Sequence, residues 1–175
     1  SGAASARRRF LVAGSHAVGA IALWAGVPDM RAAVAGAPAA PATGAGMVNL
    51  VFGQASRSLY KSSADAVYRS PDGGRLWTPV QLPPASASKR VTSIAVSAGA
   101  KGSLYVSGRG IGVLRSDNAG RNWSVRSEGL PSSDVASLAT HADRPETVYA
   151  YASGLGIFRS EDGGRHWRLM DAGPR

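Results

Sequence analysis

From residue 47 onward, the chain repeats short runs rich in Val, Ile, Leu and Tyr that are separated by Ser, Gly, Asp and Pro. Each run is only five to seven residues long and is bounded by turn-forming residues, which is typical of strands. The predicted strands are residues 48–52, 58–62, 66–70 and 77–82, then 91–97, 103–108, 112–116 and 123–127, then 135–141, 147–153, 156–160 and 167–171. Because no helical period appears after Gly46, we predict an all-β region of three groups of four strands.

One motif occurs three times within this pattern. The copies are "VYRSPDGGRLW" at residues 67–77, "VLRSDNAGRNW" at 113–123 and "IFRSEDGGRHW" at 157–167, with their Trp residues 46 and 44 positions apart. The repetition extends upstream, since "SLYVSGRGIG" from Ser103 precedes the second copy as "TVYAYASGLG" from Thr147 precedes the third. The repeating unit is therefore a four-stranded antiparallel module of roughly 40 to 50 residues, the size of a β-propeller blade.

The motif predicts a hairpin turn between the third and fourth strand of each module. Its spacing is S-x-D-x-G-x-x-W, in which the Asp accepts backbone N–H groups of the turn and the Gly permits a positive φ. The Trp is expected to pack over the turn and against the next module. The residues concerned are Ser70, Asp72, Gly74 and Trp77, then Ser116, Asn118, Gly120 and Trp123, then Ser160, Asp162, Gly164 and Trp167. The second copy has Asn in place of Asp, so we expect the same turn with weaker capping.

These segments resemble Asp-box (BNR) repeats. The family includes sialidases, sortilin-type receptor domains, certain endoglucanases and photosystem II assembly or stability factors. The resemblance implies a partial β-propeller over residues 47–175, with three blades at about 47–87, 88–131 and 132–175. It also implies that the boxes are structural turns away from the usual binding face, so it identifies no reaction by itself.

The first 37 residues differ in composition, being rich in Ala and Gly after an arginine cluster. The segment "RRRFL" resembles a twin-arginine export motif, carried by Arg7, Arg8, Phe10 and Leu11. A small-residue cleavage site at 35–37 would be followed by an Ala/Pro/Gly linker at 38–46. The alternative is an apolar helix at 10–30 that is retained as a membrane anchor, since 21 residues can span a bilayer. Either interpretation predicts a periplasmic, luminal or otherwise extracytoplasmic location for the repeats.

Composition excludes several classes of function. The chain has no Cys and only three scattered His, so neither a disulfide framework nor a zinc centre is predicted, and no motif calls for a cofactor. Residues 1–37 hold four Arg and one Asp, so +6 of the net charge of +9 belongs to the remainder. After residue 37, Lys and Arg recur once or twice per repeat and do not form a stripe interleaved with aromatic residues. We therefore predict no nucleic-acid partner.

Three arginines stand directly before the motif serines, namely Arg69, Arg115 and Arg159. They are possible binding residues that converge on an anion, but ion pairs or packed aliphatic stems on the blades are the favoured interpretation. Asp72 and Asp162 are interpreted as turn residues and not as catalytic carboxylates. His166, inside the third turn, is expected to be solvated.

Two classes of function remain after these exclusions. We favour a non-catalytic propeller that binds or assembles other proteins, associated with a membrane protein complex. The alternative is a carbohydrate-active domain with a glycan ligand, sialidase-like or another glycoside hydrolase, although the Arg-Ile-Pro segment of sialidases is missing and we expect no catalytic residues. Three blades leave two flanks open, at about residues 48–52 and 167–170. We expect a protein partner or a second copy of the chain to cover them, or the chain to be part of a longer propeller.

Overall fold

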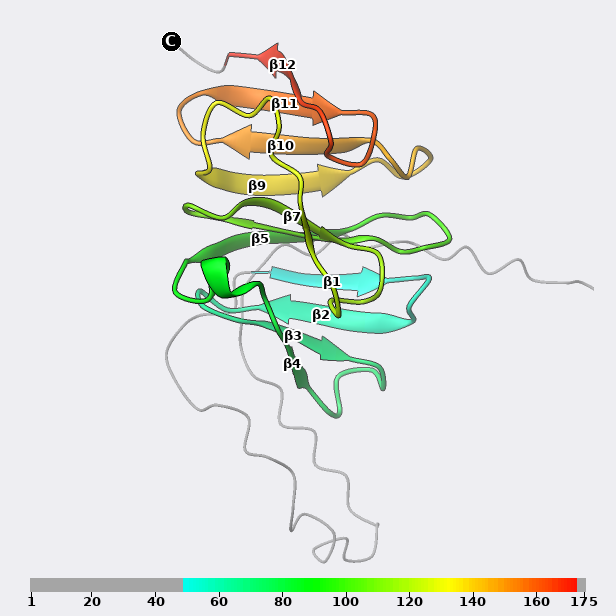
Figure 1. Cartoon of the computed structure of the whole chain (residues 1–175). Helices are drawn as coiled ribbons and strands as arrows, with labels where there is room; N and C mark the ends of the chain where they lie inside the picture. Colours follow the sequence, from blue (N-terminus) through cyan, green and yellow to red (C-terminus); the bar gives the residue numbers. More distant parts are fainter. Residues whose placement is uncertain (1–48, 173–175) are drawn as a thin grey trace, which may run out of the picture. The chain divides into compact units, whose positions relative to one another are not determined.

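A computed structural model describes residues 49–172 of the chain. In this range twelve strands form three four-stranded antiparallel sheets, in each of which the strands pair in sequence order (Figure 1). The first sheet contains β1 (Asn49–Gly53), β2 (Ser58–Ser62), β3 (Val67–Ser70) and β4 (Thr78–Val80). The second contains β5 (Val91–Val96), β6 (Leu104–Gly108), β7 (Gly112–Ser116) and β8 (Ser124–Val125). The third contains β9 (Val135–Thr140), β10 (Val148–Ala152), β11 (Gly156–Ser160) and β12 (Arg168–Asp171).

The predicted fold class, a partial β-propeller of three four-stranded blades, is confirmed. Most predicted strands match the observed ones within two residues, and the main differences lie in the fourth strands. The outermost strand of the second sheet has only two residues, and a single 3₁₀ turn at Pro84–Ser86 joins the first two sheets. Pro79 lies in β4, an edge strand, where its missing N–H leaves no partner unpaired. The predicted signal, anchor helix and linker lie outside the described residues. Within those residues, no helix is long and apolar enough to cross a membrane.

Side chains alternate between the two faces of each strand, and the second sheet buries both of its faces. Every residue of β6 and β7 is buried. On β6, Leu104 and Val106 pack toward the first sheet, whereas Tyr105 between them packs toward the third. We call the face of a sheet toward the preceding sheet its leading face, and the opposite face its trailing face. Because both faces of β6 are buried, its successive residues Leu104, Tyr105 and Val106 are all apolar or aromatic.

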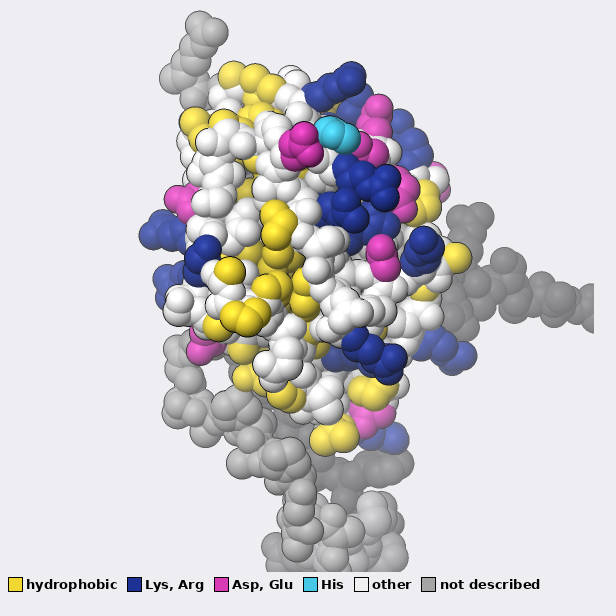
Figure 2. Space-filling model, viewed as in Figure 1, with side chains coloured by type: hydrophobic (Ala, Val, Ile, Leu, Met, Phe, Trp, Pro, Cys, Tyr) yellow, Lys and Arg dark blue, Asp and Glu magenta, His cyan; other side chains and the backbone are white. Residues whose placement is uncertain are grey.

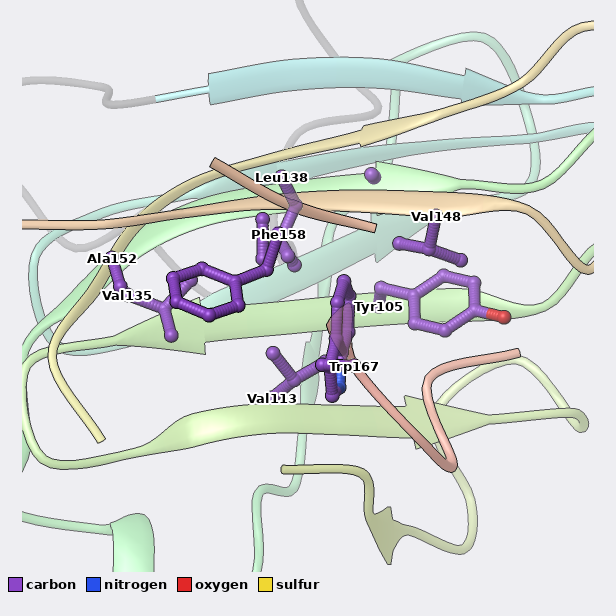
Figure 3. Close-up of a cluster of buried hydrophobic side chains, with 10 residues drawn as sticks. Tyr105, Val113, Val135, Leu138, Val148, Ala152, Phe158 and Trp167 are labelled. Atoms are coloured by element: carbon purple, nitrogen blue, oxygen red, sulfur yellow. The ribbon is translucent and has the colours of Figure 1, made fainter. Parts of the chain in front are cut away.

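Two hydrophobic cores lie between successive sheets. The core between the first and second sheets contains Tyr60, Val67, Val91, Ile94, Leu104, Val106, Ile111 and Leu114. The core between the second and third contains Ala95, Tyr105, Val113, Val135, Leu138, Val148, Ala150, Ala152, Phe158 and Trp167 (Figure 3). Each core joins the trailing face of one sheet to the leading face of the next. The sheets therefore depend on one another for burial of apolar surface.

The first strands of the three sheets are also linked by hydrogen bonds. Asn49 on β1 donates to the carbonyl of Thr92 on β5, at 2.9 Å, and Thr92 in turn donates its hydroxyl to the carbonyl of Val135 on β9, at 2.6 Å. Further along, Thr140 of β9 donates to the carbonyl of Val96 on β5, at 3.0 Å. These hydrogen bonds hold the first strands of successive sheets together.

Candidate interaction surface

The three motif segments, Ser70–Trp77, Ser116–Trp123 and Ser160–Trp167, form hairpin turns that we call the box turns. In the third, the Ser160 hydroxyl donates to Asp162 Oδ1 at 2.8 Å and accepts the backbone N–H of Gly164 at 2.8 Å. Asp162 Oδ1 also accepts the N–H of His166 at 3.0 Å. The same bonds recur around Ser70 and Asp72 and around Ser116 and Asn118. The acidic or amide side chain of each box turn therefore binds its own backbone.

These hydrogen bonds also favour the ionised form of the box carboxylates. The backbone N–H of Leu76 and the hydroxyl of Ser70 hold the pKa of Asp72 below its ordinary value. Around Asp162, partial burial opposes ionisation, but hydrogen bonds from the His166 ring, its backbone and Ser160 lower the pKa of Asp162 well below the usual range. The ring of His166, expected to be only solvated, lies with Nδ1 2.6 Å from Asp162 Oδ2 while its side chain stays mostly exposed. Ionised carboxylates that accept several hydrogen bonds are poor general acids.

The second box turn contains a residue in a strained backbone conformation. Ala119 has a φ of 60°, where the other two turns place Gly73 and Gly163 at 76° and 72°. Because a Cβ is disfavoured in this region, we expect Ala119→Gly to raise the free energy of unfolding by about 1 kcal/mol. Gly73→Ala is the matched control, since a Cβ there meets no atom within 4 Å and adds only the backbone cost. Urea denaturation should show shifts of opposite sign, and a loss of stability in Ala119→Gly would contradict this explanation.

Two of the box tryptophans join neighbouring sheets. The indole Nε1–H of Trp123 donates to the carbonyl of Gln81 in the preceding sheet, and that of Trp167 donates to the carbonyl of Arg126, both at 2.8 Å. Trp167 is only 5% exposed and belongs to the core between the second and third sheets. Its assignment to an open flank is therefore wrong, and so is the expected packing of the box Trp against the next module, because the Trp side chain points back to the preceding sheet. Leu169 and Met170, in the same predicted flank, are 55% and 53% exposed.

The leading face of the first sheet carries Trp77 in a different setting. Here Lys61 covers two aromatic rings, with Nζ 4.3 Å from the Trp77 ring centroid and 5.3 Å from that of Tyr68. Leu50 and Phe52 on β1 are 52% and 58% exposed. The predicted open flank at residues 48–52 is thus confirmed for residues 50 and 52. A cation held over two rings gives this apolar face a positive charge.

The trailing faces of the three sheets share a cross-strand pair that sequence reasoning missed. Each of the three motif arginines lies directly opposite a Tyr on the neighbouring strand. The pairs are Tyr60 with Arg69, Tyr105 with Arg115, and Tyr149 with Arg159. The signal was present in the sequence as a Tyr nine or ten residues before each motif Arg. The arginines therefore lie at one equivalent position in three different sheets.

Arg115 is buried where the second sheet meets the third. Its guanidinium donates to Asp117 at 2.8 Å and forms a two-pronged ion pair with Glu146 of the following sheet, at 2.6 and 3.1 Å. It also donates to Ser103 at 3.1 Å and to the carbonyl of Gly163 in the third box turn at 3.3 Å. Only 5% of the residue is exposed. By contrast, Arg69 donates to Ser58 at 3.1 Å and the half-exposed Arg159 pairs with Glu161 at 3.0 Å.

The ion pairs shift the titration of every member of this cluster. Burial opposes the charge of Arg115, but hydrogen bonds to Glu146 and Asp117 raise the pKa of its guanidinium above the ordinary value. The Arg115 hydrogen bond lowers the pKa of Glu146. Burial opposes ionisation of Asp117, yet bonds from Ser103 and Arg115 lower the pKa of that carboxyl too. Burial raises the pKa of the adjacent Tyr105 phenol to about 12, so it stays neutral at physiological pH.

A pH dependence follows from the lowered pKa of Glu146. A carboxyl group whose pKa is lower in the folded state adds stability above its unfolded pKa, near pH 4, and loses that stability as the pH falls toward the folded value. We expect Glu146→Gln to lower the free energy of unfolding at pH 7. Between about pH 5 and pH 3 the free energy of unfolding should fall less steeply in this variant than in the wild type. Denaturation curves at several pH values would check this. A gap between wild type and variant that stays constant over this range would contradict it.

The trailing face of the third sheet is exposed where its counterparts are covered. Tyr151 and Ile157 are each 40% exposed, while Val67 and Val113, which occupy the position of Ile157 in the first two sheets, are fully buried. The Arg159 side chain is 39% exposed. This surface of Tyr149, Tyr151, Ile157 and Arg159 is apolar with one cation, and it is the second candidate contact face.

The remaining surface mixes charges of both signs. Figure 2 shows Lys and Arg side chains next to Asp and Glu side chains, with a hydrophobic patch between charged regions. A shallow depression is lined by Asp143, Glu146 and Glu161 together with Arg144, Pro145 and Thr147. Among residues 49–172, no group of three or more His, Asp or Glu side chains is arranged to hold a metal ion.

No family model matches the chain, and no curated protein matches it. Solved structures do match, at sequence identities that show the fold alone. The structure of YCF48 bound to D1 peptide superposes with a TM-score of 0.59 and 17% identity over 71% of this chain and 40% of that one. An ancestral GH74 enzyme gives 0.58 and 23% over 74% of this chain and 19% of that one, and the GH74 xyloglucanase from Xanthomonas campestris gives 0.56 and 19% over 74% and 24%. The chain thus spans at most two fifths of the length of these proteins.

Proposed function

We propose that the chain is an exported, non-catalytic propeller-type protein of the Asp-box kind that binds or assembles other proteins in association with a membrane protein complex. The observation that carries this proposal is the pair of exposed sheet faces, at Leu50 and Phe52 on one side and Tyr151 and Ile157 on the other. Exposed apolar faces are common sites of contact between proteins. The fold is shared with YCF48, which is bound to a D1 peptide in its solved structure, so a polypeptide ligand has a precedent in a propeller of this type.

The carboxylates support a binding role over a catalytic one. A glycoside hydrolase needs a general acid with a raised pKa and a second carboxylate across the bound sugar. In the depression beside the third box turn, Glu146 is ion-paired with Arg115 and has a lowered pKa, and Glu161 is ion-paired with Arg159. Asp72 and Asp162 are engaged in their own turns. The lowered pKa values of Glu146, Asp72 and Asp162 are opposite to what a general acid requires.

Carbohydrate binding or hydrolysis is the second candidate, favoured by the fold shared with two GH74 enzymes. A glycan array and a panel of fluorogenic glycosides would separate the two proposals. We expect neither binding nor turnover above background. Hydrolysis that is abolished by Glu161→Gln or Asp143→Asn would place a catalytic carboxylate in the depression and overturn the non-catalytic proposal.

The binding role is tested by recovery of the full chain from native membranes after mild crosslinking. We expect it to co-purify in a fixed ratio with a defined membrane protein complex. A chain carrying Phe52→Asp and Tyr151→Asp is the control, because both side chains are already exposed and the substitutions add charge to the two candidate faces. Recovery of the wild-type chain as a free protein in every fraction would contradict the proposal.

Export is tested separately through the arginine motif. If the chain uses the twin-arginine route, Arg7→Lys together with Arg8→Lys should stop its appearance outside the cytoplasm. Lysine preserves the positive charge, so the loss would report on the motif and not on charge alone. Fractionation with an intact-mass measurement would also show whether the leader is removed near residue 38. Unchanged export of the double variant would rule out this route.

A further inference from the structure

Four cations lie at one end of the first two sheets without an ionic partner. Arg75 and Arg121 directly follow the last Gly of the first and second box turns. Arg57 and Lys101 lie in the β1–β2 and β5–β6 loops, which leave the sheets at the same end as the box turns (Figure 1). All four are exposed, and within residues 49–172 none of them forms an ion pair; Lys101 influences Asp117 from beyond ion-pair distance. We call these four residues the cationic end.

The acidic side chains in the same four loops are few and already engaged. Asp72 accepts hydrogen bonds from the Ser70 hydroxyl and from the backbone of its own turn. Asp117 is ion-paired with Arg115. Where the first box turn has Asp72, the second has the neutral Asn118. The corresponding loops of the third sheet contain four acidic residues, so the excess of positive charge belongs to the first two sheets.

The backbone places one of these cations where glycine is the favoured residue. Arg57 has a φ of 47°. Its equivalent in the second sheet is Gly102, with a φ of 55°, since each stands two residues before the Leu that pairs with the box serine. A side chain in this conformation is disfavoured relative to glycine. Within the described residues no hydrogen bond or ion pair of the Arg57 side chain offsets that cost, which indicates a contact with another molecule.

The arrangement of the cationic end favours a broad anionic surface as its partner. The four cations lie on four separate loops of two sheets, and the shallow depression lies elsewhere, at residues 143–147 and 161 of the third sheet. Next to Arg75, the side chain of Leu76 is 45% exposed. Figure 2 shows Lys and Arg side chains with hydrophobic ones beside them on the side where the box turns lie. Cations that flank an exposed apolar residue are typical of contact with anionic lipid headgroups.

The aromatic side chains nearby are not arranged to bind nucleic-acid bases. Proteins that bind single strands offer free aromatic faces on which bases stack. Here the Trp123 indole donates to the carbonyl of Gln81, and the ring of Trp77 is covered by Lys61. A lipid surface requires no such faces, because the phosphates meet the cations and the apolar side chain enters the interface.

We propose that the cationic end binds the surface of a membrane containing anionic phospholipids, with its four cations at the headgroup phosphates and Leu76 at the acyl boundary. This goes beyond the proposed function, because it assigns a lipid contact to loops that lie apart from the exposed sheet faces. In a longer propeller these loops would stay at the rim, since successive sheets pack through their faces and not through their hairpin loops.

Fluorescent labels at the two ends of the full chain test this contact. The chain has no Cys, so Leu76→Cys and Leu155→Cys each provide a single site for an environment-sensitive fluorophore. Leu155, in the β10–β11 loop at the opposite end of the sheets, is 43% exposed and matches Leu76 in that respect. With vesicles of phosphatidylcholine and phosphatidylglycerol mixed roughly two to one, we expect a blue shift of the emission at position 76 and none at position 155. Vesicles of phosphatidylcholine alone should shift neither.

Charge reversal tests whether the cations cause the contact. Arg75→Glu with Arg121→Glu should raise the lipid concentration that gives half of the shift at position 76 at least about tenfold. The matched control is Arg90→Glu with Arg109→Glu, two exposed arginines beside β5 and β6 at the opposite end. It changes the charge equally and should leave that concentration within about twofold. The first 37 residues are the same in every variant, so a difference reports on the cationic end.

Several results would overturn the proposal: no shift at position 76, equal shifts at both positions, a shift with phosphatidylcholine alone, or a shift indifferent to reversal of Arg75 and Arg121. A label at position 76 that responds to polyglutamate or duplex DNA but not to the vesicles would also overturn it. Thermal melts check folding, and Arg75→Gln with Arg121→Gln replaces the Glu pair if that pair unfolds. The vesicles contain no protein, and neither Phe52 nor Tyr151 belongs to the cationic end, so this test and the recovery from native membranes fail independently.

Discussion

Replacing Trp167 by Ala is expected to lower the free energy of unfolding by about 3–5 kcal/mol, the usual cost of truncating a buried large aromatic side chain. The ring is 5% exposed and packs in the core between the second and third sheets. Truncation leaves a cavity there and removes the indole hydrogen bond to the carbonyl of Arg126, which connects the two sheets. Urea denaturation followed by circular dichroism would measure the loss, and the third sheet should be the first to lose protection from hydrogen exchange.

Trp77→Ala is the matched control, since it removes the same residue from the same motif position. Trp77 lies on the exposed leading face of the first sheet, where the Lys61 ammonium is 4.3 Å from its ring centroid. We expect a cost near 1 kcal/mol, about the size of a partly exposed cation–π contact with some packing. Equal costs for the two substitutions would mean that the box tryptophans stabilise their own turns and not the contact between sheets.

The strands and box turns could be predicted from the sequence because their signals are local. Short apolar runs between turn-forming residues indicated the strands, and the repeated Ser, Asp or Asn, Gly and Trp spacing placed each turn between the third and fourth strand. The three-sheet architecture followed from the repeat length. Even the residue that departs from the motif, Asn118, accepts the expected bonds from Ser116 and Asn122. Bonds between residues two to four positions apart need no knowledge of the rest of the fold.

The direction of side chains between sheets could not be predicted in the same way. Trp167 and Leu169 are two positions apart, yet one faces the preceding sheet and the other is exposed, because the chain leaves the turn between them. Arg115 and Arg159 have similar neighbours in sequence, but within the described residues only Arg115 is followed by a sheet, whose Glu146 pairs with it. Burial and charge pairing here depend on which sheet comes next. That information lies in residues far away along the chain, as the 31 positions between Arg115 and Glu146 illustrate.

Arg115→Ala is the second substitution with a large expected effect, about 2–4 kcal/mol. Removing one member of a buried ion pair commonly costs about 3–5 kcal/mol because its partners are left uncompensated. Here Glu146 and Asp117 are 52% and 44% exposed at their side chains, so water can solvate part of the charge that remains. The variant also loses the contact with the carbonyl of Gly163, which holds the third box turn against the second sheet. We therefore expect Arg115→Ala to cost less than the upper end of the range given for buried ion pairs.

The control for Arg115 is Arg159→Ala, which changes the same position of the third sheet. Its side chain is 39% exposed and its ion pair with Glu161 lies at the surface, so we expect a cost below about 1 kcal/mol. Arg115→Lys should be more stable than Arg115→Ala but less stable than the wild type. A single ammonium group cannot make the paired hydrogen bonds by which the guanidinium binds Glu146 and Asp117. In a double-mutant cycle, Arg115→Ala with Glu146→Gln should cost less than the two single changes together. Additive costs would show that Arg115 acts through its packed stem alone.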